Sequence, residues 1–167
     1  TGSFPMTAAI RLCDHVKDYE GALAAFNTAL HLKPDFPDAR ANVGNALLGL
    51  GRTDEAITHF ENAVRLMPDF ASAHNSLGNA LQGQSKVDEA IAHYRQALRV
   101  NPTDAITLAN LGGALAEQGQ VAEAETHLRA AVAAAPDLPE ARSYLGVTLA
   151  KQGRTSEAIE HLARMTE

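Results

Sequence analysis

The chain has 167 residues, 46% of them hydrophobic, and a formal net charge of −6 at pH 7. This composition predicts a folded globular chain rather than a disordered one. Its basic residues form no cluster, so we expect neither nucleic acid nor an anionic membrane surface as a partner. No apolar run approaches the roughly 18 residues of a membrane-spanning helix, so we expect no membrane insertion. The single cysteine, Cys13, has no partner for an internal disulfide, which suits a reducing compartment and favours a cytoplasmic location.

A 34-residue repeat organises the chain. The stretch 41–68 returns as 75–102 and again as 109–136, and a proline closes each copy. A fixed period of this length predicts one helical hairpin stacked on copies of itself. We number each unit so that this proline is position 32, and we expect a single solenoid over residues 3–167, with residues 1–5 resembling a cloning remnant. The expected units are 3–36, 37–70, 71–104, 105–138 and 139–167.

Each unit is expected to contain helix A, a glycine turn, helix B and a proline turn. Glycine at position 8 and alanine at position 20 allow the two helices to approach closely. A glycine at position 15 suits the left-handed residue that ends helix A. Acidic residues are expected as helix caps. Thr53, Asp54 and Glu55 begin one helix B, and Asp137 with Glu140 resembles a capping box before a helix A.

These positions resemble the tetratricopeptide repeat. The shared pattern is Leu or Val at position 7, Gly at 8, Leu at 11, Ala at 20, an aromatic residue at 24, Ala at 27 and Pro at 32. The resemblance implies an all-α fold, a right-handed superhelical solenoid of helix-turn-helix hairpins. The first unit departs most, because its helix A lacks the position-8 glycine and carries Pro5. Position 4, where the family often has tryptophan, is Met6, Arg40, His74, Leu108 and Arg142.

Positions 2, 5, 6, 9, 12 and 13 form a second stripe on helix A, beside the stripe that packs against neighbouring helices. In the family this surface lines a concave groove. Here it is rich in side-chain amides, which both donate and accept hydrogen bonds and so can pair with an extended peptide. Two interpretations stay open, a ligand-contacting groove or solvated family consensus. The residues predicted to contact a peptide are Asn42, Asn45, Asn75, Asn79, Gln82, Asn110 and Tyr144.

No combination of residues predicts catalysis, a cofactor or a metal site. Histidine recurs at position 23, as His59, His93, His127 and His161. Equivalent residues of successive repeats should lie about 10 Å apart, given the spacing of packed helices. One zinc ion needs its nitrogen ligands within about 2.1 Å of itself. We therefore expect these histidines to pack at the edge of helix B, and Cys13 to be an inert core residue.

The last helix B is expected to expose an apolar face, because the sequence holds no further repeat to cover it. This face would comprise Ile159, Leu162 and Met165. Two explanations stay open. The sequence is a fragment of a longer protein, or the uncapped C-terminal helix forms a homo-oligomer.

The sequence favours a non-catalytic protein–protein interaction module that binds an extended peptide or partner segment in its concave groove. One alternative is a self-associating structural module. Another is the substrate-recognition arm of a larger glycosyltransferase-like enzyme, because the amide-lined groove is similar to the repeat arm of O-linked N-acetylglucosamine transferase and its bacterial relatives. A clamp for a chaperone's C-terminal carboxylate is disfavoured, since positions 2, 5 and 6 lack the required lysine and arginine.

Overall fold

The computed structural model describes residues 19–163, and helices are the regular secondary structure in this range. The all-α prediction is therefore confirmed. Residues 1–5, the first helix A with Cys13, and Met165 lie outside the described residues. The helices are α2 (Tyr19–Leu32), α3 (Pro37–Gly49), α4 (Thr53–Leu66), α5 (Ala71–Gly83), α6 (Val87–Val100), α7 (Ala105–Glu117), α8 (Val121–Ala134), α9 (Pro139–Lys151) and α10 (Thr155–Ala163).

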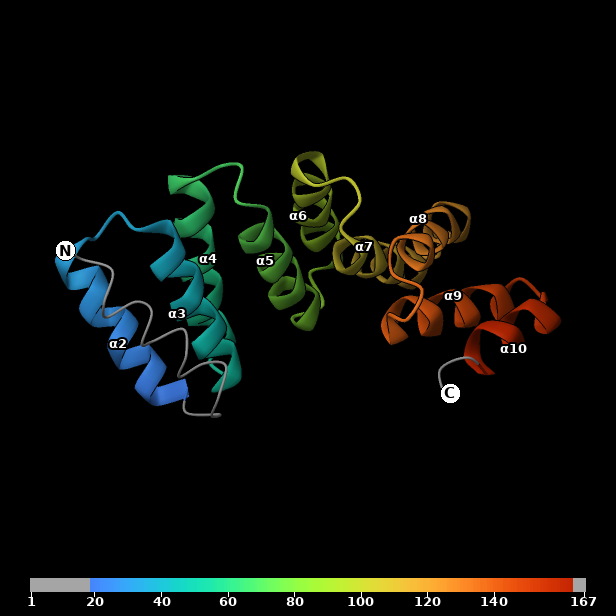
Figure 1. The fold of residues 1–167 in the computed structure, drawn as a ribbon, viewed down its shortest axis with the longest axis horizontal. Coiled ribbons are helices and arrows are strands. Elements are labelled where there is room, and N and C mark those ends of the chain that lie inside the picture. The colour runs from blue at the N-terminus through green and yellow to red at the C-terminus, as the bar shows by residue number, and fades with distance from the viewer. Residues whose placement is uncertain (1–18, 164–167) are drawn as a thin grey trace. The chain divides into compact units, whose positions relative to one another are not determined.

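The chain forms two compact units that divide between Ala80 and Leu81. In the first unit, α3 packs against both α2 and α4 (Figure 1). The ring of Phe60 on α4 lies against Gly44 on α3, where an added Cβ would come within 2.7 Å of Cε1 of the ring. The position-8 glycine has no side chain and thus leaves room for the position-24 aromatic ring. Val43 and Leu47 are buried on either side of Gly44 along α3.

In the second unit, α7 packs against α6, α8 and α9, and α9 packs against α8 and α10. In the last two hairpins of this unit, leucine replaces the aromatic residue at position 24 and fills the same space. A Cβ added at Gly112 would lie 2.5 Å from Cγ of Leu128, and one added at Gly146 would lie 2.7 Å from Cγ of Leu162. The position-8 glycine therefore accommodates either an aromatic ring or a leucine side chain in the hairpin core.

The glycine turns have the predicted backbone. Gly51, Gly119 and Gly153 have φ values of 74°, 78° and 77°, in the left-handed region that glycine adopts cheaply. The third predicted repeat has Ser85 at this point, with φ of 62°. The turn therefore keeps its shape even where the residue is not glycine.

The side-chain caps predicted for α4 and α9 are wrong, although Asp54 and Glu55 lie in the first turn of α4 as predicted. The N-caps of α4 and α9 are Arg52 and Leu138, and neither makes a side-chain capping bond. Because Pro139 is the first residue of α9, Asp137 lies one residue too early for a capping box with Glu140. A cap that the sequence analysis missed is Asp104, whose carboxylate accepts from the backbone N–H of Thr107 at 2.9 Å.

Polar side chains at position 4 replace the tryptophan that the family often has there. Each bonds to the backbone carbonyl of the repeat proline, six residues earlier. This carbonyl belongs to the turn between helix B and the next helix A, so the bond satisfies an acceptor that the helices leave unpaired. The pairs are Arg40 with Pro34 at 3.2 Å, His74 with Pro68 at 2.9 Å, and Arg142 with Pro136.

Candidate functional site

A pocket of about 220 Å³ lies between α3 and α5 in the first unit. Three of its residues, Asp38, Asn42 and Asn45, are spaced four and three residues apart, which places them on one side of α3. Ser72 and Ser76, two residues of the second stripe of α5, line the opposite wall. The pocket is lined by Asp38, Ala41, Asn42, Asn45, Phe70, Ser72, Ala73 and Ser76.

Two predicted contact residues of this unit, Asn75 and Asn79, lie on α5 outside that lining. Asn75 is half-buried and Asn79 is exposed. Both take part in interactions within the protein. The structure therefore brings Asn42 and Asn45 together at one pocket and leaves the other two asparagines beside it on α5.

In the second unit, Gln82 is held at both ends of its amide. Its Oε1 accepts a hydrogen bond from the Tyr94 hydroxyl at 2.9 Å, and its Nε2 donates to Oε2 of Glu117 at 3.1 Å. Burial raises the pKa of Tyr94, and electrostatic interaction with Tyr144 and Glu117 raises it further. The hydroxyl therefore stays protonated as a donor. This role of Tyr94 was not predicted from the sequence, although a tyrosine at a core position otherwise held by phenylalanine or leucine was a signal for it.

Tyr144 on α9 lies against Gly113 on α7. A Cβ added at Gly113 would lie 3.1 Å from Cε2 of the Tyr144 ring. The ring remains 40% exposed. Asn110 is half-buried one helical turn before Gly113 on α7. The second unit thus places an accessible aromatic ring and a side-chain amide on neighbouring helices.

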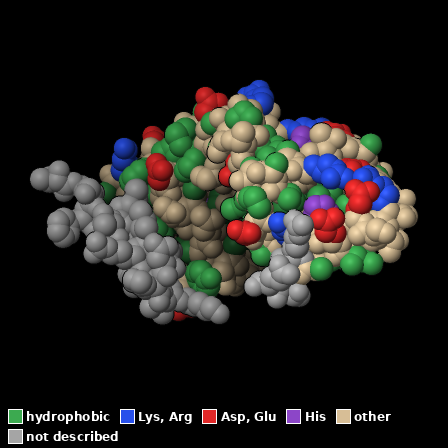
Figure 2. All heavy atoms as spheres, turned by 45° about the vertical axis from the view of Figure 1, so that its right-hand side comes forward, with side chains coloured by type: hydrophobic (Ala, Val, Ile, Leu, Met, Phe, Trp, Pro, Cys, Tyr) green, Lys and Arg blue, Asp and Glu red, His purple; other side chains and the backbone are tan. Residues whose placement is uncertain are grey.

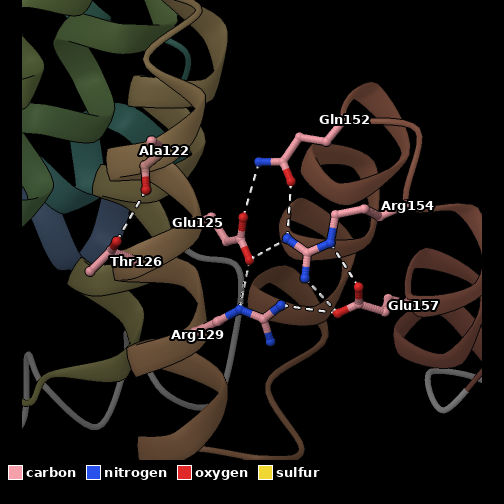
Figure 3. Close-up of polar contacts among 7 residues, drawn as sticks. All are labelled: Ala122, Glu125, Thr126, Arg129, Gln152, Arg154 and Glu157. Atoms are coloured by element: carbon pink, nitrogen blue, oxygen red, sulfur yellow. Dashed lines mark hydrogen bonds and ion pairs between the residues drawn. The ribbon is translucent and has the colours of Figure 1, made fainter.

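Four charged side chains of the second unit form one ion-pair network (Figure 3). Glu125 Oε1 accepts from Arg129 at 2.8 Å and from Arg154 at 2.7 Å. Arg154 also pairs with Glu157 at 2.7 Å, and Arg129 reaches the same carboxylate at 3.2 Å. Hydrogen bonds from Arg129, Gln152 and Arg154 lower the pKa of Glu125 to about 2. The network joins α8 to α10 and is structural in character.

The repeated histidines do not converge. Among the described residues, no group of three or more histidine, cysteine, aspartate or glutamate side chains could hold a metal ion. Nδ1 of His59 is buried without a hydrogen-bond partner, and burial lowers the pKa of this imidazole. His127 instead lies 3.7 Å from Glu123.

The surface carries charges of both signs. Figure 2 shows lysine and arginine side chains interspersed with aspartate and glutamate, without a large area of one sign on this face. None of the described helices has both the length and the apolar character needed to cross a membrane.

The last helix exposes part of its apolar face. Ile159 on α10 is 61% exposed, whereas its repeat equivalents Ile57 and Ile91 are 8% and 5% exposed. Leu162 is 38% exposed and also packs against Gly146 in its own hairpin. The two residues therefore differ, since Ile159 is an accessible side chain and Leu162 is partly a hairpin core residue.

Family models account for the repeats. One model described as a tetratricopeptide repeat matches residues 43–105 and 75–139, more than half of the chain. The chain belongs to the tetratricopeptide repeat (TPR) family. A second tetratricopeptide model matches residues 115–167, and a model described as a TPR repeat matches residues 17–51. A search of curated protein sequences found no match.

Solved TPR structures share this fold. PilW, described as a widely conserved type IV pilus biogenesis factor, is 28% identical with a TM-score of 0.88, over 98% of this chain and 76% of PilW. A thermophilic TPR protein of Thermus thermophilus, TTC0263, is 26% identical with a TM-score of 0.79, over 99% of this chain and 90% of that protein. YrrB, described as a TPR protein with an unusual peptide-binding site, is 26% identical with a TM-score of 0.76, over 96% of this chain and 82% of YrrB.

The TPR assignment sets the broad function. TPR proteins bind proteins or peptides and generally act as non-catalytic interaction scaffolds. The predicted family, the hairpin fold and the general function as an interaction scaffold are therefore confirmed.

Proposed function

We propose that this chain is a non-catalytic interaction module that binds an extended peptide or partner segment at the amide-lined face of its first unit. The observation that carries the proposal is the pocket where Asn42 and Asn45 face Ser72 and Ser76. An extended peptide presents unpaired backbone N–H and C=O groups, and side-chain amides can pair with both. The similarity to YrrB, which is described as having a peptide-binding site, supports the same class of ligand.

The expected affinity follows from the number of such bonds. Each contributes on the order of 0.5–1.5 kcal/mol net. Five or six of them contribute about 2.5–9 kcal/mol together before the cost of ordering the peptide is subtracted, so we expect micromolar affinity at the upper limit. Hydrogen bonds to the peptide backbone depend little on the ligand's sequence, so specificity requires pockets for individual side chains.

For the second unit, we propose Gln82, Asn110 and Tyr144 as the corresponding contacts. The amide of Gln82 is held by Tyr94 and Glu117, so its orientation is set before a ligand arrives. Tyr144 offers a partly exposed ring supported by Gly113. Such preorganised groups lose little conformational entropy on binding.

A displayed library of random peptides, selected on the immobilised chain, tests the proposal. We expect enriched peptides that bind with micromolar or weaker affinity in a calorimetric titration. An Asn42→Ala/Asn45→Ala variant should weaken binding about tenfold or more, since two hydrogen bonds are lost. The matched control is Asn27→Ala/Asn101→Ala, whose exposed asparagines lie outside the pocket, and its affinity should be unchanged. Circular dichroism would establish that both variants are folded.

Two results would contradict this function. A selection that enriches no more peptides on this chain than on an unrelated immobilised protein would contradict peptide binding itself. Peptides that bind the pocket variant and the control equally well would place recognition on another surface.

The exposure of Ile159 supports a second candidate function, self-association through α10. We propose that Ile159, with Leu162 and Met165, contacts a second copy of the chain. Light scattering should then show an average mass that rises with concentration. Ile159→Glu should abolish this rise, because a carboxylate is costly to bury in an apolar contact. A monomer at high concentration would exclude this candidate.

A further inference from the structure

We propose that the pocket between α3 and α5 binds one basic side chain, lysine or arginine, of the partner peptide. This inference rests on the proposed peptide-binding function, which it makes more specific. It assigns the pocket to a cationic group, whereas the amides around it serve any extended backbone.

The charge of the pocket carries the inference. Eight residues line the pocket, and all of them lie within residues 19–163, which the structure describes. Asp38 is the ionisable one among them, and its side chain is exposed. The basic residues of α3 and α5 are Arg40 and His74, and neither lines the pocket. Each bonds instead to a backbone carbonyl, at Pro34 and Pro68. The Asp38 carboxylate is therefore available to a cation supplied by the ligand.

The neutral lining suits the same group. A lysine ammonium has three donors and a guanidinium has five, and neither can accept. Asn42 and Asn45 offer amide oxygens, and Ser72 and Ser76 offer hydroxyl oxygens, beside the carboxylate of Asp38. Phe70 also lines the pocket, and aromatic rings attract cations at their faces. A carboxylate with neutral acceptors and an aromatic residue matches a basic side chain better than an acidic or purely apolar one.

The volume of the pocket also limits which chemical groups can bind in it. This volume is about 220 Å³. Small-molecule sites usually occupy about 300–1,000 Å³, so this pocket suits a single long side chain. A bound calcium ion is a poor fit, because it needs about 6–8 oxygen ligands and usually several carboxylates, and Asp38 is the lone carboxylate here.

Nuclear magnetic resonance with the full chain tests the pocket without a known peptide. The probes are Nα-acetyl-lysine methylamide, its arginine counterpart, and the neutral Nα-acetyl-norleucine methylamide. We expect both basic probes to cause saturable shifts in the side-chain amide signals of Asn42 and Asn45, with affinity in about the millimolar range. The norleucine probe should cause no saturable shift, because it lacks the charge.

Asp38→Asn is the decisive variant, since it removes the charge and keeps the shape. It should weaken binding of the basic probes about tenfold or more, as expected for loss of a hydrogen bond between charged groups. Asp137→Asn is the matched control, because it changes net charge equally at an exposed residue of the second unit. Its affinity for the probes should stay within about twofold of the parent chain.

Three outcomes would overturn the pocket assignment: equal shifts with norleucine, unchanged affinity in Asp38→Asn, or tighter binding of calcium than of the basic probes at the same signals. The peptide library separates this failure from failure of the proposed function. Enriched peptides without a lysine or arginine preference would leave peptide binding in place and remove the basic pocket. A library that yields no peptides would contradict peptide binding itself.

Discussion

The hydroxyl of Tyr94 donates a hydrogen bond of 2.9 Å to Oε1 of Gln82. Tyr94 is fully buried on α6, and Gln82 is half-buried on α5. The bond therefore connects the core of the second unit to a residue that we propose contacts a peptide. Phe26 and Phe60 occupy the same repeat position, and their rings carry no hydroxyl that could orient a surface amide.

Tyr94→Phe should keep the core packing and lose this hydrogen bond. We expect the free energy of unfolding to fall by about 1 kcal/mol, the usual net value of one hydrogen bond. Chemical denaturation measures the loss. Tyr144→Phe is the control, because its ring is partly exposed, and its stability should change by less than about 0.5 kcal/mol. Equal losses of stability in the two variants would mean that the Tyr94–Gln82 bond contributes no more than a partly exposed hydroxyl does.

Gly44→Ala and Gly83→Ala should have opposite effects on stability. A Cβ at Gly44 would lie 2.7 Å from the buried ring of Phe60, whereas one at Gly83 meets nothing within 4 Å. We expect Gly44→Ala to destabilise by about 1–3 kcal/mol through overpacking. Gly83→Ala should stabilise by a few tenths to about 1 kcal/mol, because it restricts the unfolded chain. Thermal melting of both variants checks this, and a neutral Gly44→Ala would show that the hairpin can relax around the added methyl group.

Ser85→Gly should stabilise the turn between α5 and α6. Ser85 has φ of 62°, a conformation that costs a residue with a side chain about 1–2 kcal/mol. Glycine removes that cost but gains entropy in the unfolded state, so the net gain should be about 0.5 kcal/mol. Gly51→Ser is the reciprocal variant, at φ of 74°, and should lose a similar amount. A loss of stability in Ser85→Gly, measured by chemical denaturation, would contradict this account and imply that the serine side chain supports the turn.

The ion-pair network predicts a loss of stability in acid. Hydrogen bonds from Arg129, Gln152 and Arg154 lower the pKa of Glu125 to about 2 in the folded chain, against about 4.3 when unfolded. A lowered pKa stabilises the folded state above the unfolded value, and this stabilisation is lost as pH falls from about 4.3 towards 2. Because the partner arginines are partly exposed, we expect about 1 kcal/mol rather than the full linkage value.

Glu125→Gln should therefore be less stable than the parent chain at pH 7 by about 1 kcal/mol. The two stabilities should converge near pH 2, where the parent carboxylate is also becoming protonated. Denaturation curves at several pH values measure this. Glu61→Gln, at an exposed glutamate on α4, controls for general loss of negative charge. A constant difference between Glu125→Gln and the parent chain across the range would exclude this electrostatic origin.

The helical hairpins could be predicted from the sequence because their causes are local and repeated five times. A glycine at position 15 of three repeats marks a left-handed turn, and alanine at position 20 of all five marks a close helix approach. The helix caps could not be predicted as well. Whether Asp137 or Leu138 becomes the N-cap depends on a shift of one residue, and element boundaries are the least certain part of such predictions.

The amide-rich stripe followed from helical periodicity alone, since Asp38, Asn42 and Asn45 share one side of any helix that spans them. Tertiary packing decided which of these amides meet in a pocket and which are held by neighbours. Gln82 became oriented because Tyr94 and Glu117 approach it from α6 and α7. Asp38 shares its pocket with neutral residues, and Arg40 and His74 bond to the carbonyls of the repeat prolines. Sequence period determines the face on which a residue lies, but its partners depend on how separate helices pack, which is a non-local property of the chain.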